Sequence, residues 1–341
     1  MPRFDIINKD HETQKREKLK ITKKRTITSS ILSKKGDLAE GIVTSIIGKN
    51  YFVELLEDLE FKPIECRRAG KIVVEHNNNS QIVAVGDRVR IELSDKSEEL
   101  STIVQVQNRW SSFSRMAIIG KREDVVATNA DKILIVAAAA EPFYNKRMLD
   151  RMLIAADMGG IQAGLCINKI DMMPMDFLEE DLRVYKELGI PLFFISVHKQ
   201  LNIDPVREFV LGATTIFSGQ SGVGKSSLLN LLYGEDLQRI LKISDRSGKG
   251  QHTTSAATFI RVNPTSNIID TPGLREFGLW DIKREELPLM FDDFEPYFAD
   301  CKFMPCTHTH EPGCAVKAGV DSGEIDSERY QSYLNIFETL E

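Results

Sequence analysis

The chain has 341 residues, 42% of them hydrophobic, and a formal net charge of −6 at pH 7. This length is typical of two or three domains, and the hydrophobic fraction excludes a largely disordered protein. The sequence has no run of about 18 apolar residues, and its polar start lacks a signal core, so we expect a cytoplasmic protein with no membrane partner. Five cysteines, an odd number, do not form an even disulfide framework, and clustered cysteines in a reducing compartment are more typical of metal ligands.

The charge is distributed unevenly along the chain. Residues 1–36, which we call the basic arm, carry eleven basic and four acidic side chains, a net +7, and this leaves −13 for the rest of the chain. A basic segment with few apolar residues on an acidic body is typical of an extension that binds polyanions. A solvated tail without a partner has the same composition, so both interpretations stay open.

Residues 37–110 are predicted to form a small β-barrel. Short segments rich in β-branched and aromatic residues are separated by turn residues such as Gly48-Lys49-Asn50. Five strands at this spacing fit an oligonucleotide-binding (OB-type) barrel, although SH3-like barrels have a similar pattern. The expected strands are 41–47, 51–57, 71–75, 87–93 and 102–107.

Residues 111–283 are predicted to form an α/β domain with a parallel sheet. The segment 132–140 is a continuous apolar run, which is typical of a parallel strand buried on both faces. Strands and helices then alternate along the chain, as crossover units require. The other expected strands are 163–168, 191–196, 213–219, 258–262 and 267–270, and the expected helices lie near 145–158, 176–188, 203–210 and 225–233.

Residues 284–341 are predicted to form a helical module around a metal ion. The stretch 284–300 is apolar at helical spacing, and a final helix is expected near 326–340. Between them, three thiolates and one imidazole within fourteen residues match the ligand set of a closed tetrahedral zinc site, with His310 as a second imidazole nearby. We expect one structural zinc ion, and free thiols or a redox pair are the alternative. The predicted ligands are Cys301, Cys306, His308 and Cys314.

The segment 219–226 matches the phosphate-binding P-loop pattern G-x-x-x-x-G-K-[ST] in full. An expected strand precedes it and an expected helix follows it, which argues against a chance glycine-rich turn. Glycines let the backbone wrap phosphates, and the N–H groups at the helix start bind their charge. Lys225 is expected to contact the β- and γ-phosphates, and Ser226 to bind Mg²⁺. The predicted nucleotide-binding residues of this segment are Gly219, Gln220, Ser221, Gly222, Val223, Gly224, Lys225, Ser226 and Ser227.

The sequence Asn168-Lys169-Ile170-Asp171 predicts which base is bound. It ends the expected strand 163–168, where ligands bind in sheets of this kind. A carboxylate at Asp171 accepts both the N1–H and the 2-amino group of guanine, whereas adenine offers neither donor and would leave the carboxylate unpaired. A four-residue match alone is weak, but its place at a strand end beside a P-loop favours GTP over ATP.

Two further segments are predicted to face the γ-phosphate. Asp270 and Gly273 belong to the sequence DTPG, where the carboxylate is expected to hold Mg²⁺ through water and the Gly273 N–H to contact the γ-phosphate. The loop 248–254 lies where a mobile loop is expected whose threonine binds Mg²⁺ and senses the γ-phosphate. Either Thr253 or Thr254 fits that role.

The order of these motifs is permuted, because NKID precedes the P-loop here and follows it in ordinary GTPases. With a barrel in front and a Cys/His module behind, residues 37–320 resemble the ribosome-small-subunit-dependent GTPase A family (RsgA/YjeQ) of circularly permuted GTPases. The resemblance implies a multidomain α/β protein that hydrolyses GTP in late maturation of the small ribosomal subunit. It also implies that the protein binds the rRNA of this subunit and that the subunit stimulates hydrolysis. It also implies that His308, and not His310, binds the zinc ion. The chain departs from the family pattern in having DTPG where DSPG is frequent, and in a degenerate base-supporting loop at Ser196.

Catalysis is expected to depend on Lys225 and His252. Leu274 follows the DTPG motif, where Ras-like enzymes place a glutamine that orients water, and a leucine cannot do so. Hydrolysis should therefore be slow unless another group enters, and the resemblance supports His252 in that role. A solvated or RNA-contacting histidine is the alternative.

We therefore expect a monomeric GTP hydrolase with Mg²⁺, whose partners are GTP, GDP and the small ribosomal subunit with its rRNA. A GTP-ordered RNA-binding checkpoint or scaffold with incidental hydrolysis is one alternative function. An ATP-dependent DNA-acting enzyme is another, and the NKID sequence argues against it.

Overall fold

A computed structural model describes residues 38–57, 62–74, 82–94, 99–117, 120, 122–234, 237, 257–274 and 276–340. The basic arm and the predicted switch loop with His252, Thr253 and Thr254 lie outside the described residues. Among the helices in these ranges, none is both long and apolar enough to cross a membrane.

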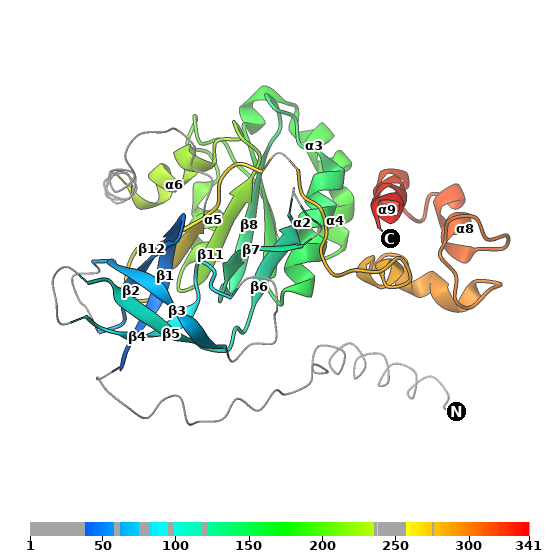
Figure 1. Ribbon diagram of the computed structural model, residues 1–341. Coiled ribbons are helices and arrows are strands. Elements are labelled where there is room, and N and C mark those ends of the chain that lie inside the picture. The colour runs from blue at the N-terminus through cyan, green and yellow to red at the C-terminus, as the bar shows by residue number, and fades with distance from the viewer. Residues whose placement is uncertain are drawn as a thin grey trace, which may run out of the picture.

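The first part of the fold is a closed five-stranded barrel (Figure 1). The strand order is β1-β2-β3-β5-β4, and β3 and β5 are parallel while the other neighbours are antiparallel. Alternate side chains such as Val43, Val53 and Ile91 fill the barrel core, which explains the β-branched pattern of the sequence. This confirms the predicted OB-type barrel, although β3 begins seven residues earlier than the expected 71. The strands are β1 (Leu38–Ile47), β2 (Asn50–Leu55), β3 (Ile64–Val74), β4 (Arg88–Glu92) and β5 (Ser101–Val106).

The second part is a six-stranded sheet of order β10-β9-β8-β11-β13-β12, with only β12 antiparallel. The predicted parallel α/β sheet is confirmed. Its members are β8 (Lys132–Ala138), β9 (Gln162–Asn168), β10 (Leu192–Phe194), β11 (Thr214–Gly219), β12 (Thr258–Arg261) and β13 (Asn267–Asp270), and its helices are α2 (Lys146–Met158), α3 (Met175–Asp181), α4 (Arg183–Glu187), α5 (Ile203–Val210) and α6 (Lys225–Tyr233).

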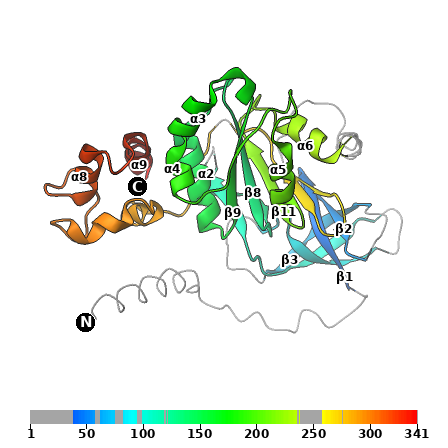
Figure 2. The ribbon, with the colours of Figure 1, turned by 180° about the vertical axis from the view of Figure 1, so that it is seen from behind.

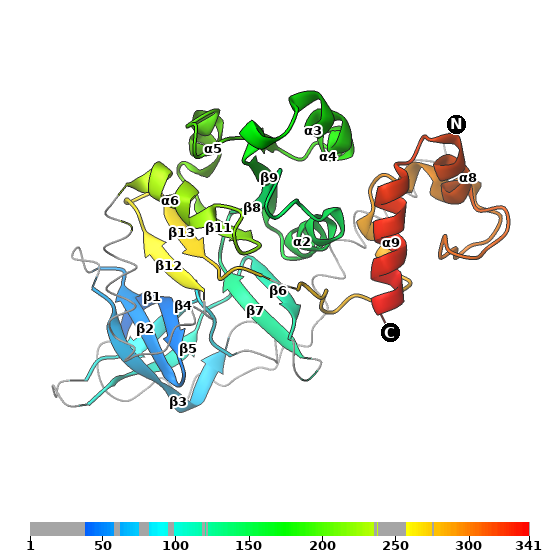
Figure 3. The ribbon, with the colours of Figure 1, turned by 90° about the horizontal axis from the view of Figure 1, so that it is seen from above.

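Helices cover both faces of this sheet (Figures 2 and 3). Ile133 and Ile135 of β8 belong to the core under α2, α3 and α4. Leu134 and Val136, which point to the other face, belong to the core under α5 and α6. The central strand is therefore buried on both sides, as its continuous apolar run indicated.

A β-hairpin that the sequence did not lead us to expect lies beside α2. It consists of β6 (Ser112–Met116) and β7 (Glu123–Thr128). The chain that leaves β13 joins this hairpin, because the Met116 N–H donates to the Gly278 carbonyl at 2.8 Å. Phe277 also stacks on Phe113, with ring centroids 5.2 Å apart. The hairpin therefore anchors the connection between the sheet and the C-terminal residues.

The C-terminal module, residues 284–341, contains two short 3-10 segments and two helices. The helical spacing of residues 284–300 does not correspond to one continuous α-helix, because Pro288 and Pro296 each lie at the start of a separate 3-10 turn. The apolar residues of this stretch nevertheless pack into the core, since Phe291 and Phe294 are fully buried. The elements are η3 (Leu287–Met290), η4 (Glu295–Asp300), α8 (Ala315–Ser322) and α9 (Ser327–Thr339), and α9 confirms the expected last helix.

The module docks on α2 through α9 (Figure 3). Arg329 of α9 forms an ion pair with Asp150 of α2, and their side chains are 6% and 0% exposed. The Tyr185 hydroxyl donates to the same Asp150 carboxylate at 2.9 Å. Arg329 also lies 4.4 Å from the centroid of the Phe291 ring and 3.4 Å from Asp293. A buried charge network therefore joins the module to the sheet domain.

Candidate nucleotide site and metal centre

The predicted nucleotide-binding motifs meet at one edge of the sheet. Asn168 ends β9, Gly219 ends β11 and Asp270 ends β13. These three strands and β8 are parallel, so their carboxyl ends lie together. The sequence order is permuted, but the sheet brings the motifs into one site.

Two glycines of the P-loop lie where a side chain would not fit. A Cβ at Gly219 would lie 2.1 Å from the Val136 carbonyl oxygen. Gly224 has a φ of +93°, and a Cβ there would lie 2.3 Å from Asn168 Nδ2. The loop therefore packs closely against β8 and β9 while α6 begins directly after it at Lys225. Ser226 and Ser227 are exposed in the first turn of α6, where backbone N–H groups favour anions.

Lys225 lies beneath this loop and is 9% exposed. Its ammonium group forms an ion pair with Asp270 and donates to the Thr271 carbonyl. The lysine predicted to bind phosphate and the carboxylate predicted to hold Mg²⁺ therefore lie side by side. This arrangement fits a magnesium–phosphate ligand, because the phosphate would be the counter-charge of Lys225 and Mg²⁺ would be the counter-charge of Asp270.

Asn168 connects the P-loop to the loop after β10. Its side-chain amide donates to the Val223 carbonyl at 2.9 Å, and its Oδ1 accepts from the Val197 N–H at 3.0 Å. Asn168 is 3% exposed, so both hydrogen bonds are shielded from water. The sequence had placed Asn168 at the site without indicating this bridging geometry.

Asp171 lies exposed beside the same loop. A hydrogen bond from the Ser196 side chain holds the pKa of this carboxyl below its ordinary value, and nearby His198 and Lys199 act in the same direction. The Ser196 hydroxyl also accepts from the Lys199 N–H at 3.0 Å. The carboxylate is thus ionised at neutral pH and able to accept hydrogen bonds from a base.

Lys169 has a left-handed backbone with a φ of +64°, and its ammonium group donates to the Glu141 carbonyl. This contact fixes the loop after β8 against the NKID segment. No sequence signal pointed to Glu141, because the contact uses only its backbone.

The DTPG turn packs against the P-loop. The Leu274 N–H donates to the Gly219 carbonyl at 3.0 Å, and Leu274 is buried at 3% exposure. A Cβ at Gly273 would lie 3.0 Å from the Ser221 nitrogen. The Thr271 hydroxyl donates to the Phe217 carbonyl at 3.0 Å. The turn is therefore in direct contact with the loop that is predicted to hold the phosphates.

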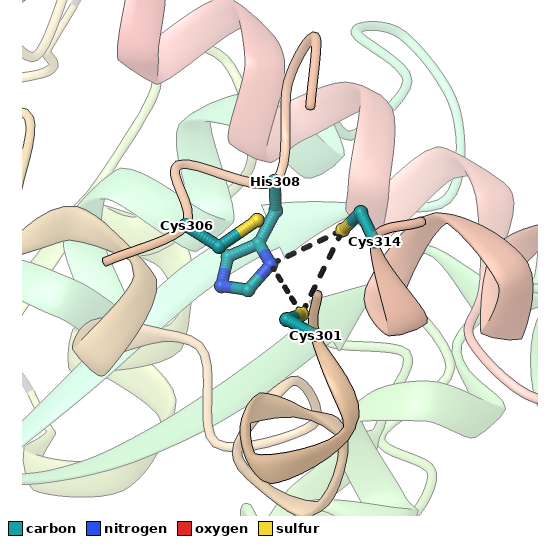
Figure 4. Close-up of side chains that lie close together, drawn as sticks. All are labelled: Cys301, Cys306, His308 and Cys314. Carbon is teal, nitrogen blue, oxygen red and sulfur yellow. Dashed lines mark hydrogen bonds between the residues drawn. The ribbon is translucent and has the colours of Figure 1, made fainter. Parts of the chain in front are cut away.

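The four predicted metal ligands converge in the C-terminal module (Figure 4). Their ligand atoms all lie within 4.8 Å of one another. His308 Nδ1 is 3.3 Å from Cys314 Sγ and 3.6 Å from Cys301 Sγ, and the two sulfurs are 4.0 Å apart. Tetrahedral zinc with bonds of about 2.3 Å to sulfur has ligand separations of about 3.8 Å. The cluster therefore fits a tetrahedral metal ion.

Surrounding residues fix the orientation of His308. Phe298 stacks on the imidazole at 5.1 Å, and the Tyr330 hydroxyl donates to the His308 carbonyl at 2.8 Å. Burial raises the pKa of the Cys306 thiol to about 12, and a thiolate in such surroundings needs a cation. Cys66 and Cys166 are buried elsewhere, as expected for apolar cysteines.

Comparisons with known proteins agree with this architecture. The family model described as RsgA GTPase matches residues 106–280. A Chlorobaculum parvum protein named small ribosomal subunit biogenesis GTPase RsgA is 37% identical over 308 residues, covering 88% of this chain and 98% of the relative. A Bacteroides thetaiotaomicron protein named small ribosomal subunit biogenesis GTPase RsgA 2 is 34% identical over 306 residues, and the match covers 89% of this chain and 97% of the relative.

Two crystal structures match most of this chain. YjeQ from Thermotoga maritima has a TM-score of 0.65 and 26% identity, and the match covers 89% of this chain and 99% of that one. YloQ, described as a circularly permuted GTPase, has a TM-score of 0.62 and 27% identity over 89% and 94% of the two chains. Since the family model covers over half of the chain and relatives above 30% identity align along most of its length, the chain belongs to the RsgA GTPase family.

Proposed function

We propose that this protein hydrolyses GTP to GDP and phosphate during late maturation of the small ribosomal subunit, and that this subunit stimulates the reaction. The observation that carries the proposal is the bridge made by Asn168, which ties the P-loop to the loop supporting Asp171. A phosphate cradle and a guanine-reading carboxylate are thereby held at one sheet edge. The names of the relatives supply the biological setting.

Within this site, Lys225 contacts the β- and γ-phosphates, and Ser226 binds Mg²⁺ together with Asp270 acting through water. The Gly273 N–H faces the γ-phosphate, and Asp171 reads the guanine base. Thr253 or Thr254 completes the magnesium shell. These assignments are supported by the positions of the P-loop, NKID and DTPG segments, and the two threonines rest on sequence alone.

The Cys/His cluster binds one zinc ion, which stabilises the C-terminal module. All four positions of a tetrahedral ion are taken by protein ligands, so the metal has no open position for substrate. The barrel, the basic arm and this module contact rRNA through phosphate contacts and stacking, and the protein acts as a monomer.

The proposal is tested by measuring GTP turnover alone and with purified small subunits, large subunits or naked rRNA. We expect a large stimulation by small subunits only, and Lys225→Ala should abolish it. His252→Ala should remove most of the stimulation if His252 positions or activates water, whereas a solvated histidine would leave it unchanged. Equal rates with all additions would contradict the proposal.

A second function, a GTP-ordered checkpoint with incidental hydrolysis, is favoured by Leu274. Its side chain is buried, and its backbone is bonded to Gly219. It therefore cannot orient water as a glutamine does. Subunit binding that depends on GTP without stimulated turnover would support this second function.

A further inference from the structure

The barrel joins the sheet domain beside the strand that leads to Asp270, and a buried ion pair lies in this interface. Glu54 of β2 pairs with Arg261 of β12 at 2.5 Å, and their side chains are 5% and 16% exposed. β12 is an edge strand of the six-stranded sheet, and β1 of the barrel lies against it (Figures 1 and 3). The barrel therefore contacts the sheet through the strand next to β13.

The pairing of β12 with β13 leads from this contact to the candidate nucleotide site. In the register of these antiparallel strands, Arg261 is opposite Asn267. Thr258, three residues before Arg261, is opposite Asp270. Three residues of extended strand span about 10 Å. The ion pair with the barrel and the carboxylate that we propose for Mg²⁺ therefore lie at the two ends of one short ladder.

The ion pair constrains this interface more tightly than its apolar contacts do. Ile42 and Ile46 of β1 pack against the core to which Phe259 of β12 belongs. Apolar contacts are non-directional and tolerate small shifts. A buried ion pair is favourable only when its geometry is good, so its two side chains must move together. A displacement of the barrel is thereby passed to β12.

A second attachment holds the barrel independently of this pair. Asp87, in the loop before β4, is fully buried and forms an ion pair with Arg109 at 2.7 Å. It also accepts a hydrogen bond from the Thr128 hydroxyl of β7 at 2.9 Å. A variant without the first ion pair would therefore keep its barrel docked, which allows the pair to be tested in a folded protein.

We propose that Glu54 and Arg261 are positioning residues that transmit the binding of RNA at the barrel to the nucleotide site. This inference rests on the proposed function, in which the barrel contacts rRNA and the small subunit stimulates hydrolysis. In this structure Asp270 pairs with Lys225, whereas hydrolysis requires each of them on its own part of the magnesium–nucleotide ligand. A misplacement of about 1 Å at such a site can change the rate about 100-fold. RNA bound to the barrel shifts β12 and β13 through the pair and brings Asp270 to the position that hydrolysis requires.

The test combines GTP turnover at saturating small subunits with hydrogen exchange of residues 257–274, measured with a GTP analogue in the presence and absence of subunits. In the unmodified protein we expect subunits to slow exchange of the β13 amides about tenfold. Glu54→Gln should remove this protection and lower the stimulated turnover number about tenfold, while turnover without subunits stays within about twofold. The subunit concentration for half-maximal stimulation should not change, because the Glu54 side chain is almost completely buried.

Three further variants separate coupling from a folding defect. Glu54→Gln with Arg261→Met removes both charges and should show the same losses in a stable protein. Arg261→Lys keeps the charge and should retain protection and stimulation. The matched control is Glu40→Gln, which removes a carboxylate that pairs with Arg90 at 3.0 Å within the barrel, and it should leave both readouts unchanged.

The outcomes distinguish this inference from the proposed function. Full stimulation and full protection in Glu54→Gln would overturn the inference and leave the proposed function intact. An unmodified protein without stimulation, whose protection still depends on Glu54, would contradict the proposed function and support the coupling. Protection that is equal in all variants would indicate direct contact between the subunit and β13, and this result, or protection absent from every protein, would overturn the inference.

Discussion

Replacing Arg329 with methionine tests how the C-terminal module is held on α2. Methionine keeps much of the apolar stem of arginine but removes its charge. Asp150 is 0% exposed, and among the described residues the Tyr185 hydroxyl would then be the one remaining partner that its carboxylate has. An uncompensated buried carboxylate costs about 3–5 kcal/mol, and we expect Arg329→Met to lower the free energy of unfolding by that amount.

The second substitution distinguishes a lost ion pair from a packing defect. Asp150→Leu combined with Arg329→Met removes both charges, and we expect stability within about 1 kcal/mol of the unmodified protein. Arg183→Met is the matched control on the surface, where Arg183 and its partner Glu187 are 58% and 60% exposed, and should cost less than about 1 kcal/mol. Urea unfolding followed by Trp280 fluorescence in a Trp110→Phe background measures all four proteins. A small effect of Arg329→Met, or a double variant no more stable than Arg329→Met alone, would refute the reasoning.

Three other predictions concern the two candidate sites. Asp171→Asn should weaken GTP binding at least about tenfold and improve binding of xanthosine triphosphate, measured by displacement of a fluorescent nucleotide; unchanged preference would exclude Asp171 as the base reader. Asn168→Ala removes two buried hydrogen bonds and should raise the Kd for GTP about 10–100-fold in calorimetry, without a change of base preference. Removing the metal with a chelator, or replacing Cys314 with serine, should abolish cooperative unfolding of the C-terminal module, and metal analysis should find one zinc per native chain; a chelator-resistant module would contradict the structural role.

Much of the fold was predictable because the strands carry their pattern locally. The apolar run of β8 and the alternating pattern of the barrel strands both reflect which residues of a single strand are buried, so each can be recognised within one short segment. The spacing of residues 284–300 did not distinguish an α-helix from 3-10 turns, because apolar residues three and four apart fit both structures. The prolines at 288 and 296 decide between them.

The candidate site was predictable in location but not in detail. Parallel strands bring their carboxyl ends together, so motifs at the ends of β9, β11 and β13 had to meet. The Asn168 bridge and the contact between Lys169 and Glu141 use backbone atoms that carry no sequence signal. Arg329 and Asp150 are separated by 179 residues and belong to no motif, so their pairing follows only from the docked helices.

The C-terminal module reaches the nucleotide edge by two physical routes. One follows the chain, from the Leu274 bond on the P-loop to the Gly278 bond on the β6–β7 hairpin. The other passes through α2, which carries Asp150 and begins after the loop whose Glu141 carbonyl binds Lys169. A ligand that moved the DTPG turn would pull on the first route while the second stays fixed through Arg329. We expect the module then either to resist the movement of the turn or to pivot about the buried Arg329–Asp150 pair.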